Sequence, residues 1–297
     1  MISAAARYFS VARAKGLRHR VRQSTWRLVA EGCIKLSVLE AAHRLSKSEP
    51  IVLLVDNSVL GHAVTHDTVW IDTGTKMWGG TVPVQTGYAA RIPVHRPDNN
   101  SRIYREVTYL VGIAELARRG LIRLVTSSEL MSEWLRHPIG RFSGYGWDDH
   151  HLFEGIEMPS VDGYVLDLKD AKQRQLQRLS ASSEQPFKDL SSHFPPKDNL
   201  DVWHVHTAHR YGIHGFLTVD FGFVEKFEKQ GEKLKPYGLV SRPVLPSDLG
   251  QSIGLRPIPT FMLSYRNARF AVHPELSSPD QKRASPNRRA KSRGDEQ

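Results

Sequence analysis

The segment IVLLV, residues 51–55, is the feature that most restricts how this chain can fold. A continuous apolar run of strand length is typical of a strand buried on both faces, as in a parallel sheet covered by helices. Two further apolar segments of strand length follow, LIRLV at 121–125 and GFLTV at 215–219. Segments with helical spacing separate them, so the pattern predicts an α/β fold with a parallel sheet.

The segments between these strands carry apolar residues at helical spacing. Helices are predicted over residues 28–46, 102–119 (with Gly120 as C-cap), 126–136, 166–182, 201–212 and 221–231. A Ser/Pro loop is expected up to Pro196. The segment GLVSRPVLP, residues 238–246, is expected to be the last strand, and PSDLGQSIG, residues 246–254, the turn that closes it.

Two segments interrupt this alternation and are interpreted as insertions. Residues 61–100 are rich in Thr, Val and Gly and are expected to form a β-hairpin or a long loop, and residues 138–165 are rich in Gly and aromatic residues. The expected organisation is a basic helical extension over 1–47, a main domain over 48–255, and a C-terminal extension over 256–297, disordered from about residue 276.

The positive charge of the chain, +10 in total, lies in its two ends. Residues 1–50 hold 10 Lys/Arg against 3 Asp/Glu, residues 251–297 hold 9 against 4, and the middle of the chain holds 22 against 24. Basic arms of this kind favour a polyanionic partner, most often a nucleic acid. Two other interpretations stay open, namely solvated tails for both arms and an organellar transit peptide for the N-terminal one.

Cysteine usage and hydropathy exclude several classes of protein. Cys33 is the single cysteine, which excludes an intramolecular disulfide and a multi-cysteine zinc site. The sequence has no apolar run near the ~20 residues that a membrane-spanning helix needs. A cytoplasmic location is therefore expected, or import into an organelle if the source is eukaryotic and the N-terminus is a transit peptide.

Carboxylates stand at corresponding places in successive elements. Asp56 directly follows the first strand and Asp220 follows the strand GFLTV. Parallel strands bring their carboxyl ends to one rim of the sheet, where the functional crevice of such folds lies. Glu133 lies two turns into the helix after LIRLV, and Asp201 begins the helix before the strand of Asp220.

The order strand–Asp, helix–Glu, helix start–Asp, strand–Asp resembles that of the PIN-domain nucleases, which belong to the flap-endonuclease-like group. The resemblance covers roughly residues 48–255. The matching segments are IVLLVDNSVL, TSSELMSEWL, DVWHVHTA, LTVDFGF and VLPSDL. It implies a three-layer α/β/α sandwich with a central, mainly parallel sheet, carrying two insertions and basic terminal extensions.

The resemblance also implies a metal-dependent endoribonuclease, either toxin-like or RNA-processing. Its catalytic and metal-binding residues would be Asp56, Glu133, Asp201 and Asp220, and its cofactor Mg²⁺ or Mn²⁺. These hard cations prefer oxygen ligands, and a cation would offset the repulsion between converging carboxylates. The hydroxyls of Ser58 and Thr218 are supporting candidates that could position water or phosphate.

RNA, single-stranded or structured, is the expected partner, with an antitoxin protein and a second copy of the chain as further candidates. Aromatic residues of the insertions could stack on unpaired bases or pack within the insertions: Trp78, Tyr88, Tyr145 and Trp147.

Each acid also has a simpler interpretation. Asp56 and Asp220 could be turn residues after strands, and Asp201 could be an N-cap or a first-turn acid that satisfies the N–H groups of its helix. Glu129 lies one turn before Glu133 on the same helix face and is an alternative ligand.

Histidines and two other functions offer alternatives to this interpretation. A histidine metal site is disfavoured, because His204 and His206 are two residues apart and point to different helix faces. His206 or His209 could contact phosphate instead. A catalytically inert nucleic-acid-binding module of the same fold is the main alternative. A phosphatase of the haloacid dehalogenase class would need an aspartate at the position of Ser58.

Overall fold

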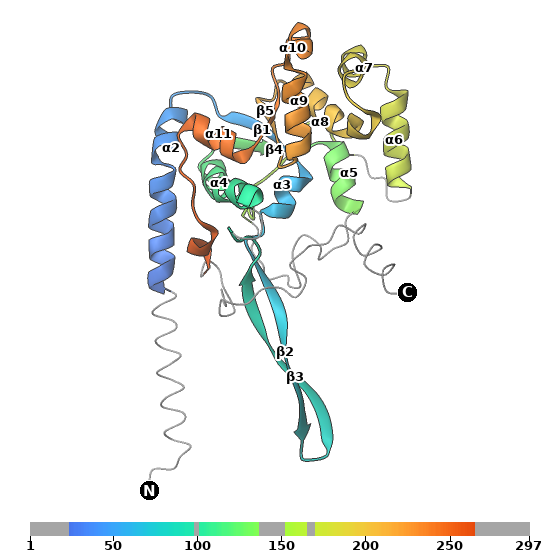
Figure 1. Cartoon of the computed structure of the whole chain (residues 1–297). Helices are drawn as coiled ribbons and strands as arrows, with labels where there is room; N and C mark the ends of the chain where they lie inside the picture. Colours follow the sequence, from blue (N-terminus) through green and yellow to red (C-terminus); the bar gives the residue numbers. More distant parts are fainter. Residues whose placement is uncertain (1–23, 98–100, 137–151, 165–169, 265–297) are drawn as a thin grey trace.

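The central sheet of the computed structural model has four parallel strands in the order β4-β1-β5-β6 (Figure 1). The structure describes residues 24–97, 101–136, 152–164 and 170–264. The strands are β1 (Ile51–Val55), β4 (Ile122–Val125), β5 (Gly215–Leu217) and β6 (Pro243–Val244). Every strand pair of this sheet is parallel, which confirms the predicted α/β class.

Helices cover both faces of the sheet. Alternate residues of β1 point to opposite faces and therefore pack against different helices. Leu53 and Val55 belong to a core shared with one group of helices, whereas Leu54 belongs to a core shared with the other. The first group is α2 (Leu39–Leu45), α3 (Asn57–His62), α4 (Ser101–Arg118) and α11 (Pro246–Ile253). The second is α5 (Ser128–Arg136), α6 (Ala171–Ala181), α7 (Gln185–Ser191), α8 (Asn199–Arg210) and α9 (Phe221–Lys229).

The remaining described elements are short or lie at the ends. Residues 24–37 are helical and lead into α2. Beyond α9 come α10 (Gly231–Leu234) and η2 (Lys235–Tyr237), while η1 (Pro196–Asp198) precedes α8 and η3 (Thr260–Leu263) follows α11. Among the described residues, no helix combines the length and apolarity needed to cross a membrane.

Most of the predicted helices are present, and two predictions were wrong. The Ser/Pro segment before Pro196 contains α7, where Pro186 stands in the first turn and Phe187 and Leu190, three residues apart, are buried. The predicted closing turn at 246–254 is the helix α11. Proline at a first helical position and glycine after the last turn are start and stop signals of a helix, not of a turn.

The first insertion forms a two-stranded antiparallel hairpin. Of the two predicted alternatives, a β-hairpin or a long loop, the β-hairpin is confirmed. Its strands are β2 (His66–Trp78) and β3 (Val82–Pro93), and Figure 1 shows them projecting away from the sheet. Trp78 and Tyr88 are exposed on it.

The other segments singled out by composition are described only in part. Tyr145 and Trp147 lie outside the described residues, as do the basic segments 1–23 and 265–297 and the tail expected to be disordered. In the second insertion the described part begins at residue 152, and its Ser160 forms an isolated parallel bridge with Thr126 after β4.

Close packing of α4 against α11 depends on a glycine. A Cβ atom at Gly250 would lie 2.3 Å from Cδ1 of the buried Tyr109. We expect Gly250→Ala to lower the free energy of unfolding by about 1–3 kcal/mol, because overpacking outweighs the better helix propensity of alanine. Gly231→Ala in α10 is the control, since a Cβ there meets open space. Urea unfolding that ranks the two variants equally would contradict this packing.

Candidate active site

The four acids lie around the point where the strand order reverses. β4 lies on one side of β1, and β5 and β6 lie on the other, so the crevice expected in an open parallel sheet lies between the ends of β1 and β5. Asp56 follows β1, and its backbone N–H donates to the carbonyl of Leu217 at the end of β5 (2.9 Å). Asp220 follows β5 three residues later.

Asp56 is a buried carboxylate held by two hydroxyls. Its Oδ2 accepts hydrogen bonds from Ser58 Oγ at 2.5 Å and from Thr218 Oγ1 at 2.6 Å. Burial raises the pKa of Asp56 above its ordinary value, and these two hydrogen bonds oppose that rise without cancelling it. Asp56 occupies the N-cap position of α3 but makes no side-chain capping bond. The simple turn interpretation therefore does not account for its burial.

Ser58 and Thr218 also tie the two strand ends together. Ser58 Oγ accepts from the backbone N–H of Val219 at 3.3 Å, and Thr218 Oγ1 accepts from that of Asp220 at 3.1 Å. Each hydroxyl thus donates to Asp56 and accepts from the backbone beyond β5. Both supporting candidates from the sequence lie beside the acids, where their hydrogen bonds hold the Asp56 carboxylate.

Glu133 reaches the same region from α5. Its Oε1 accepts from His204 Nε2 at 3.1 Å and from Gln175 Nε2 at 3.3 Å, while its Oε2 lies 3.5 Å from Asn57 Nδ2. Burial raises the pKa of Glu133, but His204, Arg136 and Gln175 together outweigh burial and hold the pKa below its ordinary value.

Glu129, the alternative to Glu133, is engaged elsewhere. Its two oxygens accept a paired set of hydrogen bonds from Arg178 at 2.9 and 3.0 Å. Such a bidentate ion pair uses both carboxylate oxygens. Of the two acids on α5, Glu133 is therefore the one that faces the other carboxylates.

Asp201 carries a second carboxyl group whose pKa is raised. Burial is the main cause that raises its pKa to about 7, and the carboxylates of Asp56, Asp220 and Glu133 add to the rise against the lowering influence of His204. Asp201 is the third residue of α8, and the N-cap of that helix is Asp198. Asp201 is therefore not the N-cap, whereas the other simple interpretation, an acid in the first turn of α8, agrees with its position.

Asp220 is the acid that caps a helix. Its Oδ1 accepts from the backbone N–H of Phe223 at 2.9 Å, in the first turn of α9. Its side chain is exposed, in contrast to that of Asp56. The group of acids is therefore buried at Asp56 and open to solvent at Asp220.

Sequence reasoning assigned the wrong histidine to this region. His206 Nε2 hydrogen-bonds Glu184 at 2.7 Å and His209 Nδ1 accepts from the backbone N–H of Val240 at 3.2 Å.

The histidine that contacts the acids is the fully buried His204, which hydrogen-bonds Glu133. Burial lowers the pKa of His204, but the carboxylates of Glu133, Asp56 and Asp201 outweigh it and raise the pKa above its ordinary value. The three-residue spacing from Asp201 was the available signal, since it places both on one face of α8.

The donor chemistry of the region suits a hard divalent cation, because all four acids offer carboxylate oxygens. Their arrangement is looser than that of a metal site. Within the described ranges, no three His, Cys, Asp or Glu side chains are placed so that they could hold a metal ion together. The acids are nevertheless close enough for Asp56, Glu133 and Asp220 to raise the pKa of Asp201.

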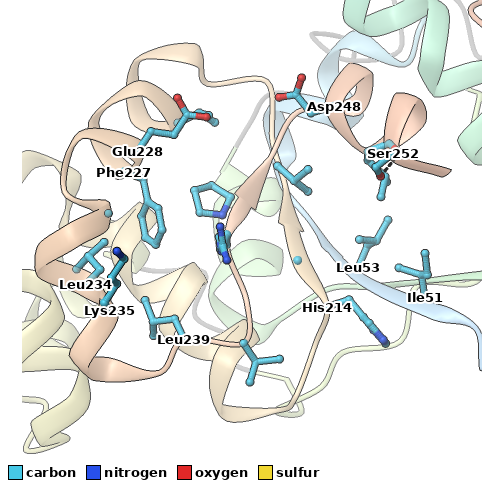
Figure 2. A pocket seen from close by; sticks show the side chains of 18 of the residues that line it. Ile51, Leu53, His214, Phe227, Glu228, Leu234, Lys235, Leu239, Asp248 and Ser252 are labelled. Atoms are coloured by element: carbon cyan, nitrogen blue, oxygen red, sulfur yellow. Dashed lines mark hydrogen bonds between the residues drawn. The ribbon is translucent and has the colours of Figure 1, made fainter. Parts of the chain in front are cut away.

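A cavity of about 940 Å³ lies away from the acids, along the β6 edge of the sheet. Figure 2 shows Phe227, Leu234 and Leu239 on one side of it and Asp248 and Ser252 on the other. None of the four acids lines this cavity. It is the uncovered edge of the sheet between two helix layers and contributes nothing to the chemistry at the ends of β1 and β5.

Four carboxylates from separate elements thus surround the switch point of the sheet, and His204 hydrogen-bonds one of them, Glu133. The hydroxyls of Ser58 and Thr218 fix the most buried of them. Comparison of the chain with models of protein families, with curated proteins and with solved structures finds no match.

Proposed function

We propose that this protein is a divalent-metal-dependent ribonuclease with a PIN-like α/β/α fold. One observation carries the proposal: the acids that follow β1 and β5 and those on α5 and α8 meet at the switch point, where burial, the main cause, and the three neighbouring carboxylates raise the pKa of Asp201 to about 7. Converging carboxylates are costly to a fold unless a ligand offsets their charge, and perturbed acids in a crevice are typical of functional sites.

Asp56, Glu133, Asp201 and Asp220 would hold the cation, Mg²⁺ or Mn²⁺. Such a cation, when bound, polarises a phosphodiester and lowers the pKa of a bound water. Ser58 and Thr218 orient the Asp56 carboxylate through its Oδ2. A shared cation requires the four side chains to converge further than they do in the structure, and Asp220, the exposed member, has the most freedom to turn.

The basic ends of the chain support a polyanionic substrate. Their excess of Lys/Arg contrasts with the slightly acidic middle of the chain, so the arms would supply phosphate contacts while the acids act on the bond. RNA is the substrate that the PIN-like order of motifs favours. An antitoxin protein and a second copy of the chain belong to the same proposal as candidate partners, and a cytoplasmic or organellar location goes with it.

A catalytically inert nucleic-acid-binding module is the second candidate. The looser arrangement of the acids favours it, because no three of the described His, Cys, Asp or Glu side chains already form a metal site. Such a module would bind RNA through the same arms without cutting it. Chelation separates the two functions, since it would stop cleavage and leave binding by the arms unchanged.

The proposal is tested by cleavage of a structured RNA with Mg²⁺ or Mn²⁺, with excess chelator as the control reaction. We expect metal-dependent cleavage by the wild-type protein. Glu133→Gln should cleave RNA more than about 10-fold more slowly, since about 10-fold is the smallest loss typical of residues that only orient a metal ligand. Glu129→Gln should keep cleavage but lose stability, because Arg178 loses its bidentate partner. Equal cleavage by the two variants would remove α5 from the site, and no cleavage by the wild-type protein would refute the function.

A further inference from the structure

We infer that His204 is a positioning residue that holds the Glu133 carboxylate in the acid cluster, together with Gln175 on the opposite helix. The inference rests on the proposed function for the role of Glu133. It adds two residues that the order of acids along the sequence does not include, and it assigns to them a task distinct from binding the cation.

His204 makes a single polar contact within the described part of the chain. Its side chain is 1% exposed, and its Nε2 lies 3.1 Å from Glu133 Oε1. A carboxylate oxygen only accepts, so Nε2 carries the proton. The other ring nitrogen, Nδ1, is buried and has no hydrogen-bond partner among the described residues. The contact with Glu133 is therefore the polar interaction that orients this ring.

Gln175 approaches the same oxygen from α6. It is 1% exposed, and its Nε2 donates to Glu133 Oε1 at 3.3 Å and to the carbonyl of Glu129 at 3.4 Å. Its Oε1 accepts from Arg136 Nη2 at 2.7 Å. Donors and acceptor on both ends of the amide fix its orientation, so the amide N–H groups point toward α5.

The two oxygens of Glu133 differ in how many hydrogen bonds they accept. Oε1 accepts from both His204 and Gln175, whereas Oε2 has Asn57 at 3.5 Å, the outer limit of a hydrogen bond. Oε2 thus keeps its capacity to bind another group. Residues that orient a ligand in this way are outer-shell partners, whose loss typically costs about 10–100-fold in metal affinity or activity.

The same helix provides a matched control in His206. His206 is also buried, and its Nε2 also hydrogen-bonds a glutamate, Glu184, at 2.7 Å. Its ring packs near Phe187 and Trp203, on the α7 side of the helix. His204 and His206 therefore match in residue type, burial and partner type, and they differ in whether that partner belongs to the acid cluster.

The test compares His204→Leu, His204→Gln and His206→Leu in the full-length chain. Cleavage rates are measured against Mn²⁺ concentration, and Mn²⁺ binding without RNA is measured by electron paramagnetic resonance. We expect His204→Leu to raise the Mn²⁺ concentration for half-maximal binding by about 10–100-fold and to leave the KM for RNA unchanged. His204→Gln should recover part of the loss, because its amide places a donor where Nε2 stands. His206→Leu should bind Mn²⁺ as the wild-type protein does.

A double variant separates positioning from packing. In a Glu133→Gln background, His204→Leu should cause no further loss of Mn²⁺ affinity, whereas a packing defect would add to it. If His204→Leu does not fold, Gln175→Leu replaces it, since it removes the second donor to Oε1 from another helix. Wild-type Mn²⁺ affinity in that variant would overturn the inference.

The failure of this inference differs from the failure of the proposed function. A wild-type protein that cleaves RNA with Mn²⁺, beside a His204→Leu variant with the same metal dependence, overturns the positioning role alone. A wild-type protein that neither binds Mn²⁺ nor cleaves RNA refutes the function and the inference together.

Discussion

Asp56→Asn is expected to lower the rate of RNA cleavage by more than about 100-fold, beyond the usual loss for an outer-shell partner, while the protein remains at least as stable as the wild type. The loss follows from removing a carboxylate at the switch point. The stability follows from burial, which raises the pKa of Asp56 and so disfavours its charged form in the folded protein. The asparagine oxygen still accepts from the hydroxyls of Ser58 and Thr218.

Asp198→Asn is the control for this prediction, because Asp198 is equally buried but lies outside the cluster. Both of its oxygens accept from Lys226 Nζ, at 2.6 and 2.8 Å. Its replacement should lower the thermal unfolding midpoint and leave cleavage unchanged, the reverse of the pattern for Asp56. An Asp56→Asn protein that melts earlier and still cleaves at a near wild-type rate would refute the metal-site interpretation.

The position of Asp56 and Asp220 could be predicted because it depends on topology alone. Once the strands are parallel, their carboxyl ends share a rim, and an acid after each strand follows the backbone there. The choice of Glu133 over Glu129 came from the motif order. The structure adds a physical reason, since Arg178 from α6 occupies both oxygens of Glu129.

The histidine and the two missed helices depend on signals other than the order of the strands. Spacing within α8 places His204 beside Asp201, but only the tertiary arrangement of α5 and α8 brings it to Glu133. For α7 and α11, proline and serine were interpreted as loop residues. In both helices the proline occupies the first turn, where its missing N–H needs no partner.

Asp201→Asn is expected to stabilise the protein at pH 8 in the presence of chelator. The pKa of Asp201 is about 7 in the folded protein against an ordinary value of 3.8. A carboxyl group with a raised folded-state pKa contributes stability that is complete below pH 3.8 and is lost as the pH rises through about 7. At 1.36 kcal/mol per pH unit, the loss amounts to at most about 4 kcal/mol at pH 8.

The measurement is the free energy of urea unfolding between pH 4.5 and pH 8, with chelator throughout. Wild-type stability should fall across this range, and the fall should be smaller in Asp201→Asn. Part of the fall should remain in the variant. His204 also has a raised pKa, so its contribution to stability is likewise lost as the pH rises. Glu228→Gln, an exposed acid on α9, should follow the wild-type curve. Identical curves for the wild type and Asp201→Asn would show that the charge on Asp201 does not destabilise the folded protein as the pH rises.

Adding Mn²⁺ at pH 8 connects this stability to the proposed function. A ligand that binds only the folded state stabilises it by about 2.7 kcal/mol at 100 times its Kd, so saturating Mn²⁺ should restore much of what the wild-type protein loses at high pH. Asp201→Asn replaces a proposed carboxylate ligand by a neutral amide and should gain less. The difference in stability between the two proteins should therefore narrow when Mn²⁺ is added, because the variant is more stable in chelator and the wild type gains more from the metal. If Mn²⁺ stabilises both proteins equally, Asp201 does not bind the cation.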